Sequence, residues 1–146
     1  MSPVEAVRGR LLTLTPVTAL VSTRIYPMKL PQSPTLPAIR LMLVGVIEFL
    51  HFRGTDLMWR ARVQVDAVAK EASGINAYAQ VQAIAAAVHG RFVGGVATGL
   101  CGWAGTVGSP PCRVAAMIPD GRIEGYDPDE LQQVRVSQDY VVWLKP

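Results

Sequence analysis

The chain has 146 residues, half of them hydrophobic and 17% charged, and its net charge is +3. This composition excludes a disordered chain and predicts one folded domain spanning residues 1–146. The basic residues are scattered along the sequence, which argues against sequence-specific nucleic-acid binding. No stretch reaches the ~20 apolar residues that span a bilayer. Charges at Glu5, Arg8 and Arg10 argue against a signal peptide, so we expect folding in the cytoplasm without a membrane partner.

The N-terminus carries a helix signal. Ser2, Pro3 and Glu5 form an S-x-x-E capping box with proline at the first helical position. Apolar residues follow at helical spacing and are expected to face the core: Val4, Val7, Leu11 and Leu14. Thr15-Pro16 ends this helix and can start a further turn, with three residues directed inward: Val17, Leu20 and Val21.

Two β-strands are predicted after a proline-rich, extended connection. Residues 38–49 are apolar and β-compatible, and residues 58–70 alternate between apolar and polar side chains. Together they predict a hairpin with a polar tip at residues 53–56. In the second strand, Arg60 and Arg62 fall on the polar face.

The second half of the chain predicts one helix and two further strands. An alanine-rich helix is expected from Ser73 to Gly90, with Ser73 as its cap. Residues 92–112 are rich in glycine and predict a flexible loop with room for a short strand. Strands at residues 113–118 and 134–144 are separated by a turn at 119–121 and a capped helical turn at 127–131. The predicted fold is α+β, with a mixed or mainly antiparallel sheet of four to five strands packed against two helices.

Residues with catalytic potential are few. His51 and His89 are the only histidines, which excludes a His-rich metal centre, and Cys101 and Cys112 are expected to be free thiols. The glycine runs match neither a P-loop nor a dinucleotide fingerprint. We therefore expect no catalytic, cofactor-binding or metal site, and a protein that is not an enzyme.

The order of these features resembles the tail completion, or tail terminator, proteins of long-tailed bacteriophages and gene transfer agents. The resemblance covers nearly the whole chain and rests on the helix-containing N-terminus and on residues 17–21, 24–27, 36–38, 62–66 and 136–143. The glycine-rich segment from Gly94 to Pro111 departs from the family by its length.

The resemblance implies a structural virion protein assembled in the host cytoplasm. It implies a hexameric ring on the head-proximal end of the tail tube, which ends tail polymerisation and joins the tail to the head connector or stopper protein. DNA would pass through the lumen without sequence readout. We expect partner contacts at the hairpin tip, on its second strand and in the glycine-rich loop: Arg53, Thr55, Asp56, Arg60, Arg62 and Trp103.

The sequence also allows alternative functions. The chain could be another head–tail joining protein, either a stopper or a minor tail subunit, because fold does not fix function. A small ligand-binding module or hydrolase would use the glycine-rich loop as a lid over a pocket with converging polar groups. A nonspecific nucleic-acid binder would show steep salt dependence.

Overall fold

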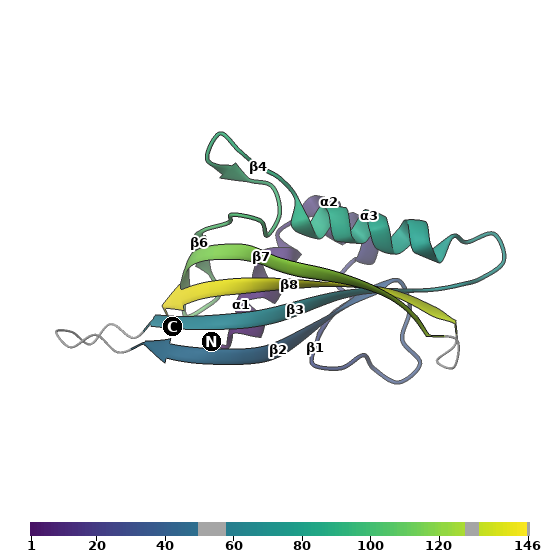
Figure 1. The fold of residues 1–146 in the computed structure, drawn as a ribbon, viewed down its shortest axis with the longest axis horizontal. Helices are drawn as coiled ribbons and strands as arrows, with labels where there is room; N and C mark the ends of the chain where they lie inside the picture. The colour runs from purple at the N-terminus through teal and green to yellow at the C-terminus, as the bar shows by residue number, and fades with distance from the viewer. Residues whose placement is uncertain (50–57, 128–131, 146) are drawn as a thin grey trace.

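A twisted six-stranded sheet backed by three helices forms the fold in the computed structural model (Figure 1). The structure describes residues 1–49, 58–127 and 132–145. In these ranges the strand order is β1-β2-β3-β8-β7-β6, and only the β1–β2 pair is parallel. The predicted hairpin tip at 53–56 and most of the predicted helical turn at 127–131 lie outside the described residues.

The first two helices follow the predicted capping pattern. Helix α1 spans Pro3–Leu12, and the Ser2 hydroxyl and the Glu5 carboxylate each bind the other residue's backbone amide. Helix α2 spans Thr15–Val21, so Pro16 begins a complete second helix. The prediction that Leu20 points inward was wrong, because its side chain is 39% exposed.

Strands β1, β2 and β3 build one side of the sheet. Strand β1 is Ile25–Pro27, β2 is Ala38–Phe49 and β3 is Met58–Lys70. The bounds of β2 and β3 agree with the predicted hairpin strands, and the two strands pair antiparallel with one bulge between Leu43 and Gly45. Strand β1 covers β2 only along Ile39–Leu41.

Helix α3 spans Ala77–His89 and begins four residues later than predicted. Asn76, not Ser73, caps it, because the Asn76 side chain accepts a hydrogen bond from the Ala79 amide. The residues before it turn through an isolated bridge between Ala72 and Ile75. Gly90 ends the helix as predicted, with a φ of 66° that disfavours other residues.

The glycine-rich segment at 92–112 contains more regular structure than the predicted loop. Strands β4 (Phe92–Val93) and β5 (Val96–Ala97) form a small hairpin that stands out from the body beside the end of α3 (Figure 1). Strand β6 (Gly105–Val107) then joins the main sheet at the edge of β7. Two- and three-residue strands are too short to give a periodic sequence signal.

The last two strands are long partners. Strand β7 spans Cys112–Asp127 and β8 spans Gln133–Lys145. The predicted turn at 119–121 was wrong: β7 continues through it, with a register shift between Pro119 and Arg122. Pro119 has no amide to donate, and Gly121 has a φ of 126°. Both residues fit in a bulge of β7, and the strand pairs with β8 before and after this bulge.

All three helices contribute to one core, on one face of the sheet. This face is built from alternate residues of β2, β3, β7 and β8, and fully buried examples are Leu41, Val63, Met117, Tyr140 and Leu144. The α+β class with a mixed sheet is confirmed. The predicted strand and helix numbers were low, because α2, β1 and β6 are short elements with little pattern of their own.

Candidate interaction surfaces

The structure separates the predicted contact residues that it describes into two places. Arg60 and Arg62 lie on β3, on the sheet face opposite the core. Trp103 lies between β5 and β6 and packs against the core. The other three candidates, Arg53, Thr55 and Asp56, lie outside the described residues. Whether any of the six contacts a partner stays a prediction.

We call the sheet face opposite the helices the polar face. Its central arginine is Arg62, which donates to Asp139 at 3.1 Å and also to Asp120 on the β7 bulge. Next to it, the Arg60 guanidinium lies 5.8 Å from the centroid of the Trp143 ring, and Trp143 stacks on Phe49 at 5.6 Å. The ion pairs of Arg62 with Asp120 and Asp139 therefore connect β3 to β7 and β8. Because these side chains are partly exposed, water screens the ion pairs.

A buried carboxylate lies on the same face. The Asp66 side chain has no exposed surface and accepts hydrogen bonds from Arg40, at 2.9 and 2.6 Å. Its other oxygen accepts from the Gln64 amide at 2.8 Å. Because a buried charge needs both a counter-ion and hydrogen bonds, this cluster holds β2 and β3 in a single register.

The polar face carries more cations than carboxylates. The register places seven basic residues on it: Arg40, Arg60, Arg62, Lys70, Arg113, Arg135 and Lys145. Four carboxylates share this face in the described ranges: Asp127, which the register places there, and Asp66, Asp120 and Asp139, each of which binds an arginine. The net charge of this face is therefore positive. A positive face attracts a polyanion such as a phosphate backbone, but it does not read base sequence.

Contacts within the same subunit fix the position of Trp103. The Arg10 guanidinium lies 4.7 Å from the Trp103 ring centroid and donates to the carbonyls of Ala97 and Gly99. The Met117 amide donates to the Trp103 carbonyl, and the Met117 carbonyl accepts from the Gly102 amide. These contacts fix the base of the β4–β5 hairpin to α1 and β7.

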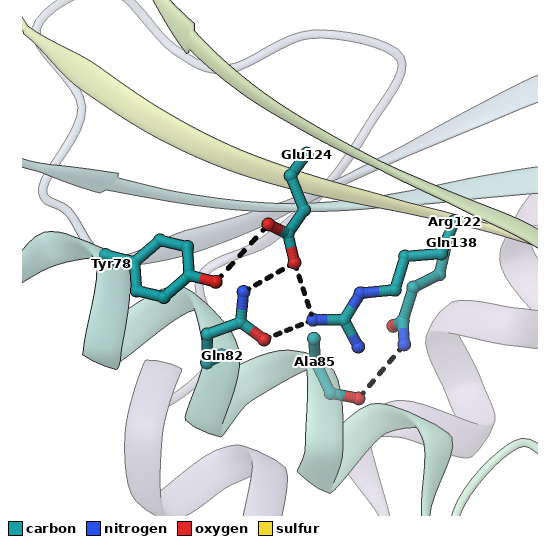
Figure 2. Close-up of polar contacts among 6 residues, drawn as sticks. All are labelled: Tyr78, Gln82, Ala85, Arg122, Glu124 and Gln138. Carbon is teal, nitrogen blue, oxygen red and sulfur yellow. Dashed lines mark hydrogen bonds and ion pairs between the residues drawn. The ribbon is translucent and has the colours of Figure 1, made fainter.

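A polar network joins α3 to β7, as Figure 2 shows. Gln82 donates to Glu124 at 2.7 Å, Tyr78 donates to the same carboxylate at 3.4 Å, and Arg122 donates to both Glu124 and Gln82. The Gln82 hydrogen bond, followed by Arg122, lowers the pKa of the Glu124 carboxyl below its ordinary value of 4.5. Sequence reasoning missed this network, because its residues meet only through the packing of α3 on the sheet.

Below this network, the buried Gln138 side chain donates to the Ala85 carbonyl at 3.2 Å (Figure 2). The bond attaches β8 to the middle of α3. The helix is rich in alanine, and Ala77 and Ala85 are among its buried residues.

A cleft of about 700 Å³ opens between the end of α3, the β7 bulge and β8. Its polar lining includes Arg91, Arg122 and Asp139, and His89 Nδ1 lies 3.2 Å from the hydroxyl of Tyr140. Burial raises the pKa of the Tyr140 phenol, so this group stays protonated at neutral pH. The cleft is adjacent to the glycine-rich segment, where a ligand-binding function would need its pocket.

The two cysteines lie in the glycine-rich segment and at the start of β7. Cys101 and Cys112 are free thiols, and burial raises the pKa of the Cys112 thiol, which donates to the Lys145 carbonyl at 3.3 Å. In the part of the chain that the structure describes, no three His, Cys, Asp or Glu side chains gather as metal ligands would. None of the helices in the described ranges combines the length and apolarity that a membrane crossing demands.

The fold places the chain among small α+β domains in which a mixed sheet packs against helices. A chain from a solved structure described as the virion of a native gene transfer agent (GTA) particle shares this fold, with a TM-score of 0.62 and 16% sequence identity. The match covers 97% of this chain and 96% of the other. No curated protein matches the sequence.

The sequence identifies the family within this class. The profile of tail completion protein gp17 matches residues 5–108, which is most of the chain. The chain therefore belongs to the tail completion protein gp17 family and is a structural protein of a phage-type tail. The matched region includes α2, α3, most of α1 and the β4–β5 hairpin.

Proposed function

We propose that the protein caps the head-proximal end of the tail tube as a hexameric ring, ends tail polymerisation and joins the tail to the head connector. The observation that carries this proposal is the family match over residues 5–108, together with a fold shared along 97% of the chain with a gene transfer agent virion subunit. A protein that completes a tail acts at the end where growth stops.

The architecture supports a ring subunit. A cyclic ring needs two different contact surfaces on opposite sides of each copy, because its interfaces are heterologous. The described sheet has two long strands, β2 and β7, near opposite edges, each with an unpaired stretch. We propose that the positive polar face, with Arg60 and Arg62, lines the lumen and contacts DNA phosphates without reading bases.

We also propose that this role involves no catalysis. The family is one of structural tail proteins, and binding to a tube end and to a connector requires surface complementarity rather than bond making. The Cys101 amide donates to the His89 carbonyl, which brings these two residues together. The His89 ring, however, contacts the Tyr140 hydroxyl.

The direct experiment mixes the purified protein with growing tail tubes and images the ends by negative-stain electron microscopy. We expect one density at a single tube end and an arrest of tube elongation. Six copies of 15.8 kDa give a ring of about 95 kDa by light scattering. Binding to the portal-adaptor ring and not to tube ends would establish a stopper instead, and binding along the tube would establish a minor tail subunit.

The cleft beside His89 favours one second candidate, a small ligand-binding module. A screen of small anionic and aromatic compounds by thermal shift tests it. Saturable binding that is lost in a Tyr140→Phe/Arg122→Ala variant, together with no effect on tubes, would replace the ring proposal.

A further inference from the structure

Two strand segments of the six-stranded sheet are paired on one side only. Strand β1 covers β2 as far as Leu41, so β2 from Met42 to Phe49 pairs with β3 alone among the described residues. Strand β6 covers β7 only along Cys112–Val114, so the rest of β7 in the described ranges pairs with β8 alone. Such edges present a row of free amides and carbonyls that another strand can bind.

Both edges expose large apolar side chains. On β2, Ile47 is 49% and Phe49 is 41% exposed, and on β7, Ile123 is 72% and Tyr126 is 57% exposed. Each edge is regular after its bulge, over residues 45–49 of β2 and residues 122–127 of β7. Exposed β-branched and aromatic residues favour strand pairing, so the charged residues of these edges decide which pairing is allowed.

We infer that these two segments pair with each other between copies of the chain, so that β2 of one subunit extends the sheet of the next beside its β7. This inference rests on the ring of the proposed function and names the interface that closes it. The strands β2, β3, β8 and β7 alternate in direction, so β7 runs opposite to β2. A neighbour in the same orientation therefore presents its β2 antiparallel to β7, and the contact is heterologous, as a ring requires.

Side-chain chemistry selects one register. Ile47 pairs with Arg60 and Ile123 pairs with Ser137, which places both isoleucines on the polar face. Pairing Ile47 of one copy with Ile123 of the next then sets Glu48 opposite Arg122. A shift of two residues would instead place Glu48 opposite Glu124, and like charges directly opposite one another destabilise a strand pair. A shift of one residue would put the two isoleucines on opposite faces.

The test is a disulfide across the inferred interface in the full-length protein. The variant Ile47→Cys/Ile123→Cys is assembled on tail tubes and treated with diamide, which takes up two electrons and two protons as two thiols form one disulfide. Opposed Cβ atoms in an antiparallel pair lie about 4.5–5.5 Å apart, close enough for rapid cross-linking. We expect a ladder of covalent oligomers on a non-reducing denaturing gel, which a reductant collapses to monomer.

The controls separate this register from accidental collision. Val46→Cys/Ile123→Cys places the thiols on opposite faces, and each single variant lacks a partner thiol, so these give no ladder. The wild type reports any cross-link from the half-buried Cys101 or the buried Cys112.

A charged substitution provides an independent measurement. Ile123→Lys puts an ammonium on the inferred interface and should weaken ring assembly on the order of tenfold or more. Val93→Lys, at an equally exposed site on the β4–β5 hairpin, should leave assembly unchanged. Both variants should unfold at the wild-type temperature.

The outcomes distinguish the interface from the function. If capped tubes and rings form but only the control pair cross-links, or if Ile123→Lys assembles normally, the strand pairing is overturned and the proposed function stands. If the wild type neither forms rings nor caps tubes, the proposed function is overturned, and the interface with it.

Discussion

The guanidinium of Arg10 on α1 lies over the ring of Trp103, 4.7 Å from the ring centroid, and hydrogen-bonds the carbonyls of Ala97 and Gly99. One side chain thereby ties the first helix to both ends of the segment that connects β5 to β6. This contact therefore holds the glycine-rich region against α1.

Arg10→Ala should destabilise the protein by about 2 kcal/mol, because it removes charge-assisted hydrogen bonds and the stacking on Trp103. Urea denaturation measures the change. Arg113→Ala is the matched control: this arginine is exposed and makes no side-chain hydrogen bond among the described residues, so its loss should cost no more than ~0.5 kcal/mol. Equal effects of the two substitutions would refute a structural role for Arg10.

The ion pairs of the polar face should differ in strength according to burial. Asp66→Ala should cost about 3 kcal/mol, because Arg40 and Gln64 lose their acceptor in a fully buried position. Asp139→Ala should cost at most about 1 kcal/mol, since its bridge to Arg62 is exposed. Chemical denaturation of both variants gives the comparison, and a smaller loss for Asp66→Ala would contradict the assignment.

The network between α3 and β7 should make stability depend on pH in the acid range. The folded-state pKa of Glu124 is lowered, so its carboxylate stabilises the fold above the ordinary pKa of 4.5, and that contribution is lost as pH falls through the lower folded value. The difference in unfolding free energy between wild type and Glu124→Gln should therefore be constant near neutral pH and shrink below pH 4.5.

The control for this titration is Glu48→Gln on the exposed edge of β2, which has no side-chain hydrogen bond among the described residues. Its unfolding free energy should follow the wild-type pH profile. A Glu124→Gln difference that stayed the same from pH 7 to pH 3 would show that the network stabilises the fold through packing and not through the carboxylate charge.

The junction between α3 and the β4–β5 hairpin should accept only glycine. A Cβ at Gly90 would collide with the backbone of Gly99, and a Cβ at Gly99 would lie 2.6 Å from the His89 carbonyl. Gly90 also has a φ of 66° and a ψ of −155°, a region essentially limited to glycine, so Gly90→Ala should cost more than the ~1–3 kcal/mol of that strain alone. Gly74→Ala is the matched control, because Gly74 has a similar φ of +76° in open space.

Thermal unfolding of these two variants compares a glycine with close backbone neighbours and a glycine in open space, both with positive φ. We expect a clearly larger drop in Tm for Gly90→Ala than for Gly74→Ala. If both variants lost the same stability, the close approach of the helix end to the segment at Gly99 would have no energetic consequence.

Local patterns in the sequence determined the elements with a repeating or capped signal. The alternation along residues 58–70 gave the bounds of β3, and the Ser2–Glu5 capping box gave the start of α1. The order of these elements along the sequence also indicates the tail completion family, independently of any tertiary contact. Periodicity and capping act over a few residues, so a single sequence carries them.

Tertiary contacts decided the rest. Because β7 pairs with β8 on both sides of Pro119, the strand continues where the sequence predicted a turn. The packing of α3 on the sheet places Gln82 within hydrogen-bonding distance of Glu124. Neither result is visible in the sequence, because a bulge and a turn share the same proline and glycine, and the partners of the network are far apart along the chain. Which strand edges stay unpaired is likewise decided only when the whole sheet has formed, since an edge is defined by the neighbour it lacks.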